Sequence, residues 1–148
     1  MAIPQLNSNG LLPVGIHDTT LDEIRERFGV FQENDRRPKL FAKLVEMVAA
    51  MRASGLFEEL LFDGSFVTAK SAPNDIDLVA VLKPGHDFER DLPMSEYSMV
   101  ARTVLRRRFG FDVVVAERDS RLYNSYVELF SRVCAAPNLK KGLLKLKL

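Results

Sequence analysis

Two aspartates with the spacing of metal ligands precede an apolar stretch in the middle of the chain. Asp75 and Asp77 are separated by one residue, and the run from 78 to 82 is apolar. In a β-strand, residues two positions apart point to the same face, with Cα atoms about 6.6 to 7 Å apart. Two such carboxylates can converge on one or two divalent cations, Mg²⁺ or Mn²⁺, of the kind that serve phosphoryl transfer. Asp75 and Asp77 are therefore predicted metal ligands and catalytic residues.

A Gly-Ser turn precedes these acids at a distance that suits a nucleotide. Gly64 and Ser65 follow an apolar strand predicted over residues 56–62, and nine residues separate Ser65 from Asp75. Gly64 leaves room for a phosphate to approach the backbone. Ser65 offers a hydroxyl, and backbone amides of the turn can donate to phosphate oxygens. Lys70 can meet a phosphate as a point charge, so these three residues are the predicted nucleotide-binding residues.

A third carboxylate is expected to complete the metal site and to accept a proton from an attacking hydroxyl. We assign this role to Asp112, which follows Gly110 and opens the predicted strand 111–116. Glu117 lies five positions further on, so a regular strand turns it to the opposite face. Asp63 is a weaker alternative, and a solvated strand end is the purely structural explanation for Asp112.

Each of the two motifs alone has a structural explanation. An Asp-x-Asp sequence is usually a solvated strand end, and a Gly-Ser pair is usually a turn. The two motifs together, with an apolar strand on either side and this spacing, are much rarer. The combination favours a site for a nucleoside triphosphate and a divalent metal.

The elements that must position these residues follow from local patterns. Thr20 to Glu23 forms a capping box for a helix that ends at Gly29. Apolar residues at helical spacing predict a second helix from about Pro38 to Gly55. The remaining expectations are strands over 56–62, 75–82 and 111–116, helices over 95–108 and 120–133, and an edge strand over 144–148. The predicted fold class is α+β, one domain over 1–148 with an irregular leader (1–18), a small mixed sheet with flanking helices, and a basic tail (137–148).

The joint motif resembles the signature of the DNA polymerase beta-like nucleotidyltransferase superfamily. The resemblance rests on Gly64-Ser65-x9-Asp75-Ile76-Asp77-Leu78 and on Phe111-Asp112-Val113-Val114. It implies the nucleotidyltransferase fold, use of Mg²⁺ (or Mn²⁺) and a nucleoside triphosphate, and transfer of a nucleoside monophosphate.

More of the chain is similar to a poorly characterised family of small prokaryotic nucleotidyltransferase-like proteins. This similarity implies kinship with the minimal nucleotidyltransferases of toxin–antitoxin modules, some of which modify a partner protein or tRNA. A protein or RNA hydroxyl is thus the expected acceptor. The alternative is a non-catalytic module of the same fold that binds nucleotide or neutralises a partner. The similar segments are 12–17, 20–23, 63–70 and 141–144.

Composition and charge limit the type of protein, its partners and its expected compartment. The 148 residues suit one domain, and 47% hydrophobic with 28% charged residues is ordinary for a globular protein. A net charge of +1 predicts no strong general attraction to nucleic acid or to anionic membranes. No apolar run is long enough for a membrane span, and the first residues do not resemble a signal peptide. Cys134 is the single cysteine, so the expected compartment is a reducing cytoplasm.

Overall fold

The computed structural model describes residues 3–30, 34–63, 65–68, 73, 76–84, 94–133 and 136–148. The helices are α1 (Leu21–Phe28), α2 (Arg36–Ser54), α3 (Met94–Val100), α4 (Arg102–Phe109) and α5 (Arg121–Phe130), with a short 3-10 helix η1 (Ser65–Val67). The strands are β1 (Ile16–Thr19), β2 (Phe57–Asp63), β3 (Asp77–Leu82), β4 (Asp112–Glu117), β5 (Arg132–Val133), β6 (Ala136–Lys140) and β7 (Leu143–Lys147).

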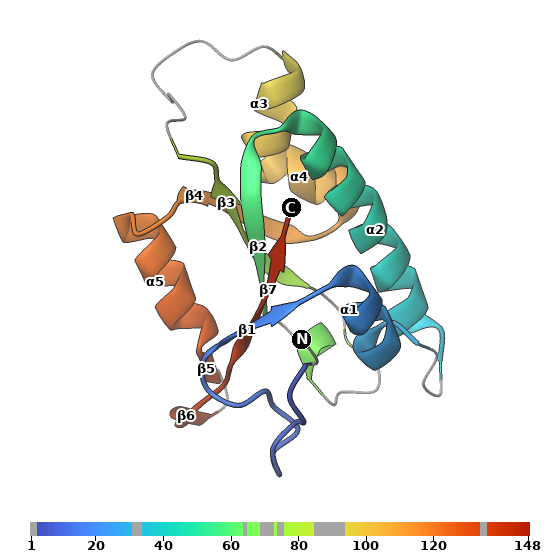
Figure 1. The fold of residues 1–148 in the computed structure, drawn as a ribbon, viewed down its shortest axis with the longest axis vertical. Coiled ribbons are helices and arrows are strands. Elements are labelled where there is room, and N and C mark those ends of the chain that lie inside the picture. Colours follow the sequence, from blue (N-terminus) through green and yellow to red (C-terminus); the bar gives the residue numbers. More distant parts are fainter. Residues whose placement is uncertain are drawn as a thin grey trace.

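Within the described residues, five strands form a mixed sheet in the order β1-β7-β2-β3-β4. The outer pairs β1–β7 and β3–β4 are parallel, whereas β2 is antiparallel to both of its neighbours. Strands β5 and β6 pair separately in a small antiparallel sheet. The α+β class and the mixed sheet with flanking helices are therefore confirmed (Figure 1).

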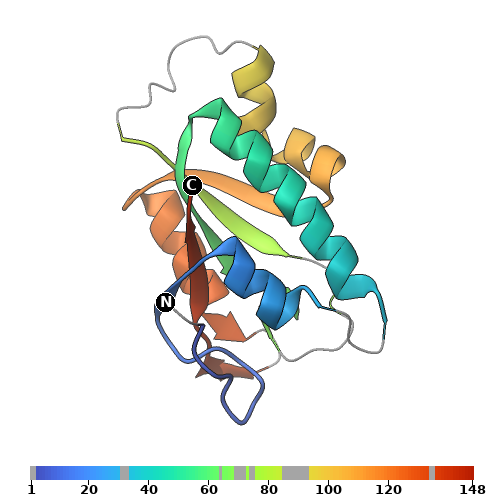
Figure 2. The same ribbon diagram turned by 45° about the vertical axis from the view of Figure 1, so that its right-hand side comes forward.

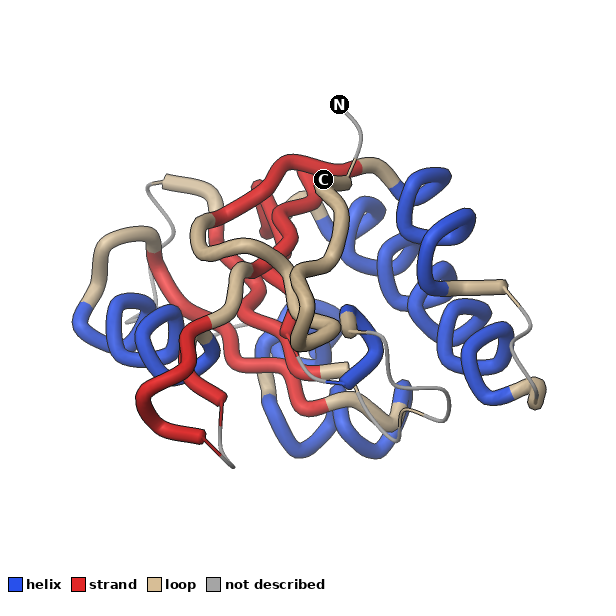
Figure 3. The backbone as a smooth tube through the Cα atoms, turned by 90° about the horizontal axis from the view of Figure 1, so that it is seen from below, coloured by secondary structure: helices blue, strands red, loops and turns tan. Residues whose placement is uncertain are grey.

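Helices cover both faces of the five-stranded sheet. Helices α1 to α4 pack on one face, where they share a core with alternate residues of the central strands. Helix α5 covers the other face through Tyr123 and Phe130, which belong to one hydrophobic cluster with Leu61 and Val79. Figures 2 and 3 show the strands lying between these two groups of helices. Because β2 and β3 are buried on both faces, polar side chains near their ends must find partners.

Capping signals in the sequence correctly predicted several helix starts and ends. Thr20 Oγ1 accepts a hydrogen bond from the Glu23 amide at 3.2 Å, as the capping box predicts. Helix α2 ends at Gly55, which adopts φ +69°. Helix α5 starts where expected, since Ser120 Oγ accepts from the Tyr123 amide at 3.1 Å.

Two helix predictions were wrong in their extent. The helix expected over 95–108 is two helices, α3 and α4, separated by Ala101 in an extended conformation (φ −82°, ψ 114°). The break lets Met99 of α3 and Leu105 of α4 enter the same core. The last helix ends at Phe130 rather than at 133, because Arg132 and Val133 pair with β6.

The two ends of the chain were also predicted wrongly. The leader is not irregular throughout, because Ile16–Thr19 is strand β1. The tail supplies β7, which is not an edge strand but lies between β1 and β2. The Leu-Lys alternation indicated one solvated face. However, Lys145 Nζ lies 3.2 Å from Asp18 Oδ1 and 4.0 Å from Glu59 Oε2, so carboxylates on the neighbouring strands β1 and β2 provide its counter-charges.

Among the described residues, no helix combines the length and the apolar character that crossing a membrane requires.

Candidate active site

Three aspartates lie side by side across the three strands β2, β3 and β4. Asp77 is the register partner of Asp112 on the parallel strand β4 and of Asp63 on the antiparallel strand β2. Neighbouring strands are about 4.8 Å apart, and residues directly opposite each other share a face of the sheet. Asp63, Asp77 and Asp112 therefore form one row, which we call the carboxylate row, on the face covered by α5.

The neighbours of Asp77 along β3 define the surroundings of the row. Val79 and Val81 point to the same face as Asp77 and are fully buried against α5. Asp77 itself is half-buried at the start of the strand. Like charges at adjacent register positions repel each other, so the row needs positive charge nearby.

Arg102 supplies that charge to Asp112. Its Nε and Nη2 donate to the two carboxylate oxygens of Asp112 at 2.6 and 2.7 Å. Its Nη1 donates to Tyr126 Oη on α5 at 3.1 Å. The hydrogen bonds from Arg102 hold the pKa of Asp112 below its ordinary value, against the opposing effect of burial. The same pairing raises the pKa of Arg102, so both groups are charged at neutral pH.

Lys141 neutralises the other end of the row. Its Nζ lies 2.7 Å from Asp63 Oδ1, and the two side chains are only 14% and 7% exposed. Lys141 belongs to the connection between β6 and β7, so the tail of the chain reaches back to the end of β2. The structure therefore brings both candidates for the third carboxylate, Asp112 and Asp63, next to Asp77.

Of the other predicted site residues, Ser65 alone belongs to the part of the chain that the structure describes. Asp75, Gly64 and Lys70 lie outside the described residues. The backbone of Ser65 starts η1 two positions after Asp63, so this turn leaves β2 beside the row. In the described ranges, which omit Asp75, no three His, Cys, Asp or Glu side chains gather as they would around a metal ion.

The sequence had no signal for the partners of the row. Arg102 precedes Asp112 by ten residues and belongs to no motif, and the break before it was not predicted. Tyr126 lies within the helix predicted over 120–133, but nothing in the sequence indicated its contact with Arg102. Lys141 was part of the predicted basic tail, without any indication that its side chain would be largely buried. Each of these contacts depends on how distant elements pack.

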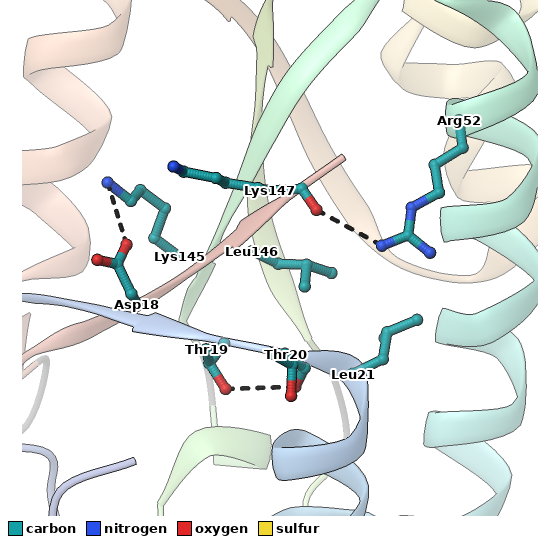
Figure 4. Close-up of a pocket in the computed structure, with 8 residues that line it drawn as sticks. All are labelled: Asp18, Thr19, Thr20, Leu21, Arg52, Lys145, Leu146 and Lys147. Carbon is teal, nitrogen blue, oxygen red and sulfur yellow. Dashed lines mark hydrogen bonds and ion pairs between the residues drawn. The ribbon is translucent and has the colours of Figure 1, made fainter. Parts of the chain in front are cut away.

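Two open pockets among the described residues lie away from the row. One, of about 430 Å³, lies at the opposite ends of β3 and β4 and is lined by both acidic and basic residues. The other, of about 340 Å³, lies between β1, β7 and the helices α1 and α2. Figure 4 shows that its polar groups already pair: Lys145 with Asp18, and Arg52 with the carbonyl of Lys147 at 3.5 Å. Neither pocket contains a residue of the predicted site.

Comparisons with known proteins identify a family but not an activity. No match was found among curated proteins or among solved structures. A family model described as "Family of unknown function (DUF6932)" matches residues 4–147. This match spans nearly the whole chain, including the carboxylate row and both terminal strands. The chain therefore belongs to the DUF6932 family of unknown function.

Proposed function

We propose that the protein is a nucleotidyltransferase that depends on Mg²⁺ or Mn²⁺, and that it has the fold of the nucleotidyltransferase superfamily. It would transfer a nucleoside monophosphate from a nucleoside triphosphate to a hydroxyl of a protein or an RNA, as one component of a toxin–antitoxin or defence module. The observation that carries the proposal is the register of Asp77 with Asp112 on adjacent parallel strands. This pair lies beside the end of β2, from which the Gly-Ser turn departs.

The residues of the row are of the chemical type that binds a hard divalent cation, although the described acidic side chains do not gather around a common point. Carboxylate oxygens are the ligands that Mg²⁺ prefers, and the row is a concentration of negative charge that already attracts Arg102 and Lys141. Asp77 and Asp112, with Asp75 assigned from the sequence, would hold the metal. The bound metal would neutralise charge on the triphosphate and on the leaving pyrophosphate.

In the proposed reaction the oxygen of the acceptor hydroxyl forms a bond to the α-phosphorus. The bond from that phosphorus to the bridging oxygen of the β-phosphate breaks, and pyrophosphate leaves with the electron pair. The proton of the hydroxyl passes to a carboxylate of the row, which we assign to Asp112. Asp112 is deprotonated at neutral pH and so can accept the proton, but its pairing with Arg102 holds its pKa low and makes it a weaker base until that pairing is released. Arg102 must first release at least one of its oxygens.

A second candidate function is a non-catalytic module of the same fold that binds nucleotide or neutralises a partner protein. The specific observation in its favour is that Arg102 occupies both oxygens of Asp112 while Lys141 contacts Asp63. Both ends of the row, Asp112 and Asp63, are thereby neutralised by side chains of the same chain. A site with a purely structural role would have the same arrangement.

Thermal unfolding with each of ATP, GTP, CTP and UTP, with and without Mg²⁺, tests the proposal. A ligand at about 100 times its dissociation constant stabilises the folded state by roughly 2.7 kcal/mol, or about 5–10 °C for a domain of this size. We expect one nucleotide to raise the midpoint only with Mg²⁺, and Asp77→Asn to abolish the rise. Asp22→Asn, at a side chain 79% exposed on α1, is the matched control.

Labelled nucleotide then separates the two candidate functions. Transfer of a nucleoside monophosphate moves an α-phosphate label, but not a γ-phosphate label, onto the acceptor. A Mg²⁺-dependent stabilisation without any transfer from α-labelled nucleotide, in lysate or with purified RNA, would favour the non-catalytic module. No stabilisation by any of the four nucleotides at millimolar concentration would refute the enzyme and the nucleotide-binding module, and would leave only a module that neutralises a partner protein.

A further inference from the structure

A buried arginine holds the turn that follows β2. Arg37, in the first turn of α2, is only 1% exposed. Its Nη1 donates to the carbonyl oxygens of Phe28 at 3.2 Å and Phe66 at 2.6 Å. Its Nη2 donates to the carbonyl oxygen of Thr68 at 2.7 Å. One side chain of α2 thus joins the end of α1 to the segment that contains η1.

Two aromatic rings enclose the same guanidinium. Its central carbon lies 5.8 Å from the ring centroid of Phe28 and 5.4 Å from that of Phe66. The two rings are 6.1 Å apart and tilted by 50°. Cation–π contacts of this kind are strongest where water is excluded. Burial lowers the pKa of Arg37, but a guanidinium stays protonated at neutral pH.

A packing role alone does not require this residue type. A buried charge is costly unless it is hydrogen-bonded, and a Met or Leu would fill an apolar position without that cost. The planar guanidinium instead presents several donors in a fixed fork, which a lysine ammonium cannot reproduce. Here the fork reaches carbonyls of two separate segments, so the arrangement specifies where the η1 backbone lies.

The held segment directly adjoins the proposed nucleotide site. Phe66 and Thr68 follow Ser65, and η1 leaves β2 beside Asp63 and the carboxylate row. We infer that Arg37 is a positioning residue: it fixes the backbone of the turn on which the triphosphate is bound. The inference rests on the function proposed above, since it assigns Arg37 a role in the same nucleotide site.

The first arm of the test measures the turn without any nucleotide. Val67, 2% exposed in η1, is replaced by cysteine in a Cys134→Ser background, and its labelling by a thiol reagent is timed. Arg37→Lys should speed labelling about tenfold, the change expected when roughly one net hydrogen bond is lost. A cysteine at Val79, fully buried in β3, should label at an unchanged rate. Arg52→Lys, an exposed arginine on the same helix, is the control substitution.

The second arm measures binding of ATP, GTP, CTP and UTP with Mg²⁺. Arg37→Lys should weaken binding of the triphosphate that stabilises the wild type by about tenfold or more, with a smaller effect on the corresponding monophosphate. A general structural defect would weaken both alike. If Arg37→Lys does not fold, Phe66→Leu takes its place, because it keeps an apolar side chain but removes one ring from the guanidinium.

Each outcome decides the inference. Faster labelling at position 67 alone, together with selective loss of triphosphate binding, supports it. Labelling at the wild-type rate overturns it whatever the nucleotide data show. If the wild type binds nucleotide and Arg37→Lys binds it equally well, the inference is also overturned, but the proposed function is not. Absence of nucleotide binding by the wild type itself refutes the proposed function, and the inference with it.

Discussion

Replacing Arg102 with glutamine should have opposite effects on stability and on metal affinity. Arg102 donates to both carboxylate oxygens of Asp112 at 2.6 and 2.7 Å. If Asp112 is a metal ligand, a divalent cation must compete with this arginine for the carboxylate oxygens. Arg102→Gln should therefore destabilise the metal-free protein and tighten its binding of Mn²⁺ or Mg²⁺.

The size of both effects follows from the exposure of the pair. The side chains of Arg102 and Asp112 are 51% and 28% exposed, so solvent screens the interaction, and such pairs contribute about 0.2–1 kcal/mol. The bidentate geometry favours the upper half of this range. We expect a loss of about 0.5–1 kcal/mol, which lowers the unfolding midpoint by about 1–4 °C. In Arg102→Gln this free energy no longer opposes metal binding, so the affinity for the divalent cation should rise about two- to fivefold over wild type.

Binding of Mn²⁺, followed by the electron paramagnetic resonance signal of the free ion, measures this affinity directly. Arg107→Gln is the matched control, because it removes the same formal charge from an exposed position of α4. Tighter binding in Arg102→Gln alone would support Asp112 as a ligand. Equal or weaker binding than in the Arg107→Gln control would refute the reasoning, and would favour a purely structural pair.

The remaining predictions concern pH and the two ends of the chain. The folded-state pKa of Asp112 lies below the ordinary value of 3.8. The stability from its pairing is therefore fully present above about pH 5 and is lost as pH falls through and below about 4. The difference in unfolding free energy between wild type and Arg102→Gln should accordingly shrink in acid, and a difference that grows below pH 4 would contradict this sign. Lys141→Met breaks a largely buried ion pair with Asp63 and should cost about 3 kcal/mol in denaturant unfolding; a loss below about 1 kcal/mol would mean that the pair is unimportant. Gly142→Ala should cost about 3 kcal/mol or more, since its Cβ would meet a backbone carbonyl oxygen at 1.9 Å. Gly55→Ala, which has φ +69° but open space around it, should cost only about 1–2 kcal/mol, and equal costs at the two glycines would contradict this account.

Features with local causes were predicted from the sequence. The capping box at Thr20 and the N-cap at Ser120 each depend on a side chain and an amide three residues away. The strand that opens at Asp112 and the helix that ends at Gly55 likewise follow from signals within one element. Such contacts form between neighbours in the chain, so a short window of sequence contains all that is needed to predict them.

Features with distant causes were not predicted. The alternating Leu and Lys residues of β7 indicated an exposed edge, whereas Lys145 finds its counter-charges on Asp18 and Glu59 of two other strands. Gly142 was noted only as part of a segment similar to a known family, but its amide donates to the carbonyl of Leu12 at 2.9 Å. Nothing in either segment alone shows that the two ends of the chain meet.

The sequence by itself determined which residues can do chemistry: a Gly-Ser turn, two acids two positions apart, and further acids at the ends of apolar strands. It also determined the types of the larger helices and of the central strands β2, β3 and β4, because hydrophobic periodicity and caps act over a few residues, but not those of β1, β5 and β6. Only the tertiary structure decided that Asp63, Asp77 and Asp112 form one row, and that Arg102 and Lys141 neutralise its ends. The physical reason is that strand order and register arise from pairing between segments far apart in the chain, and a shift of one residue would turn each acid to the other face.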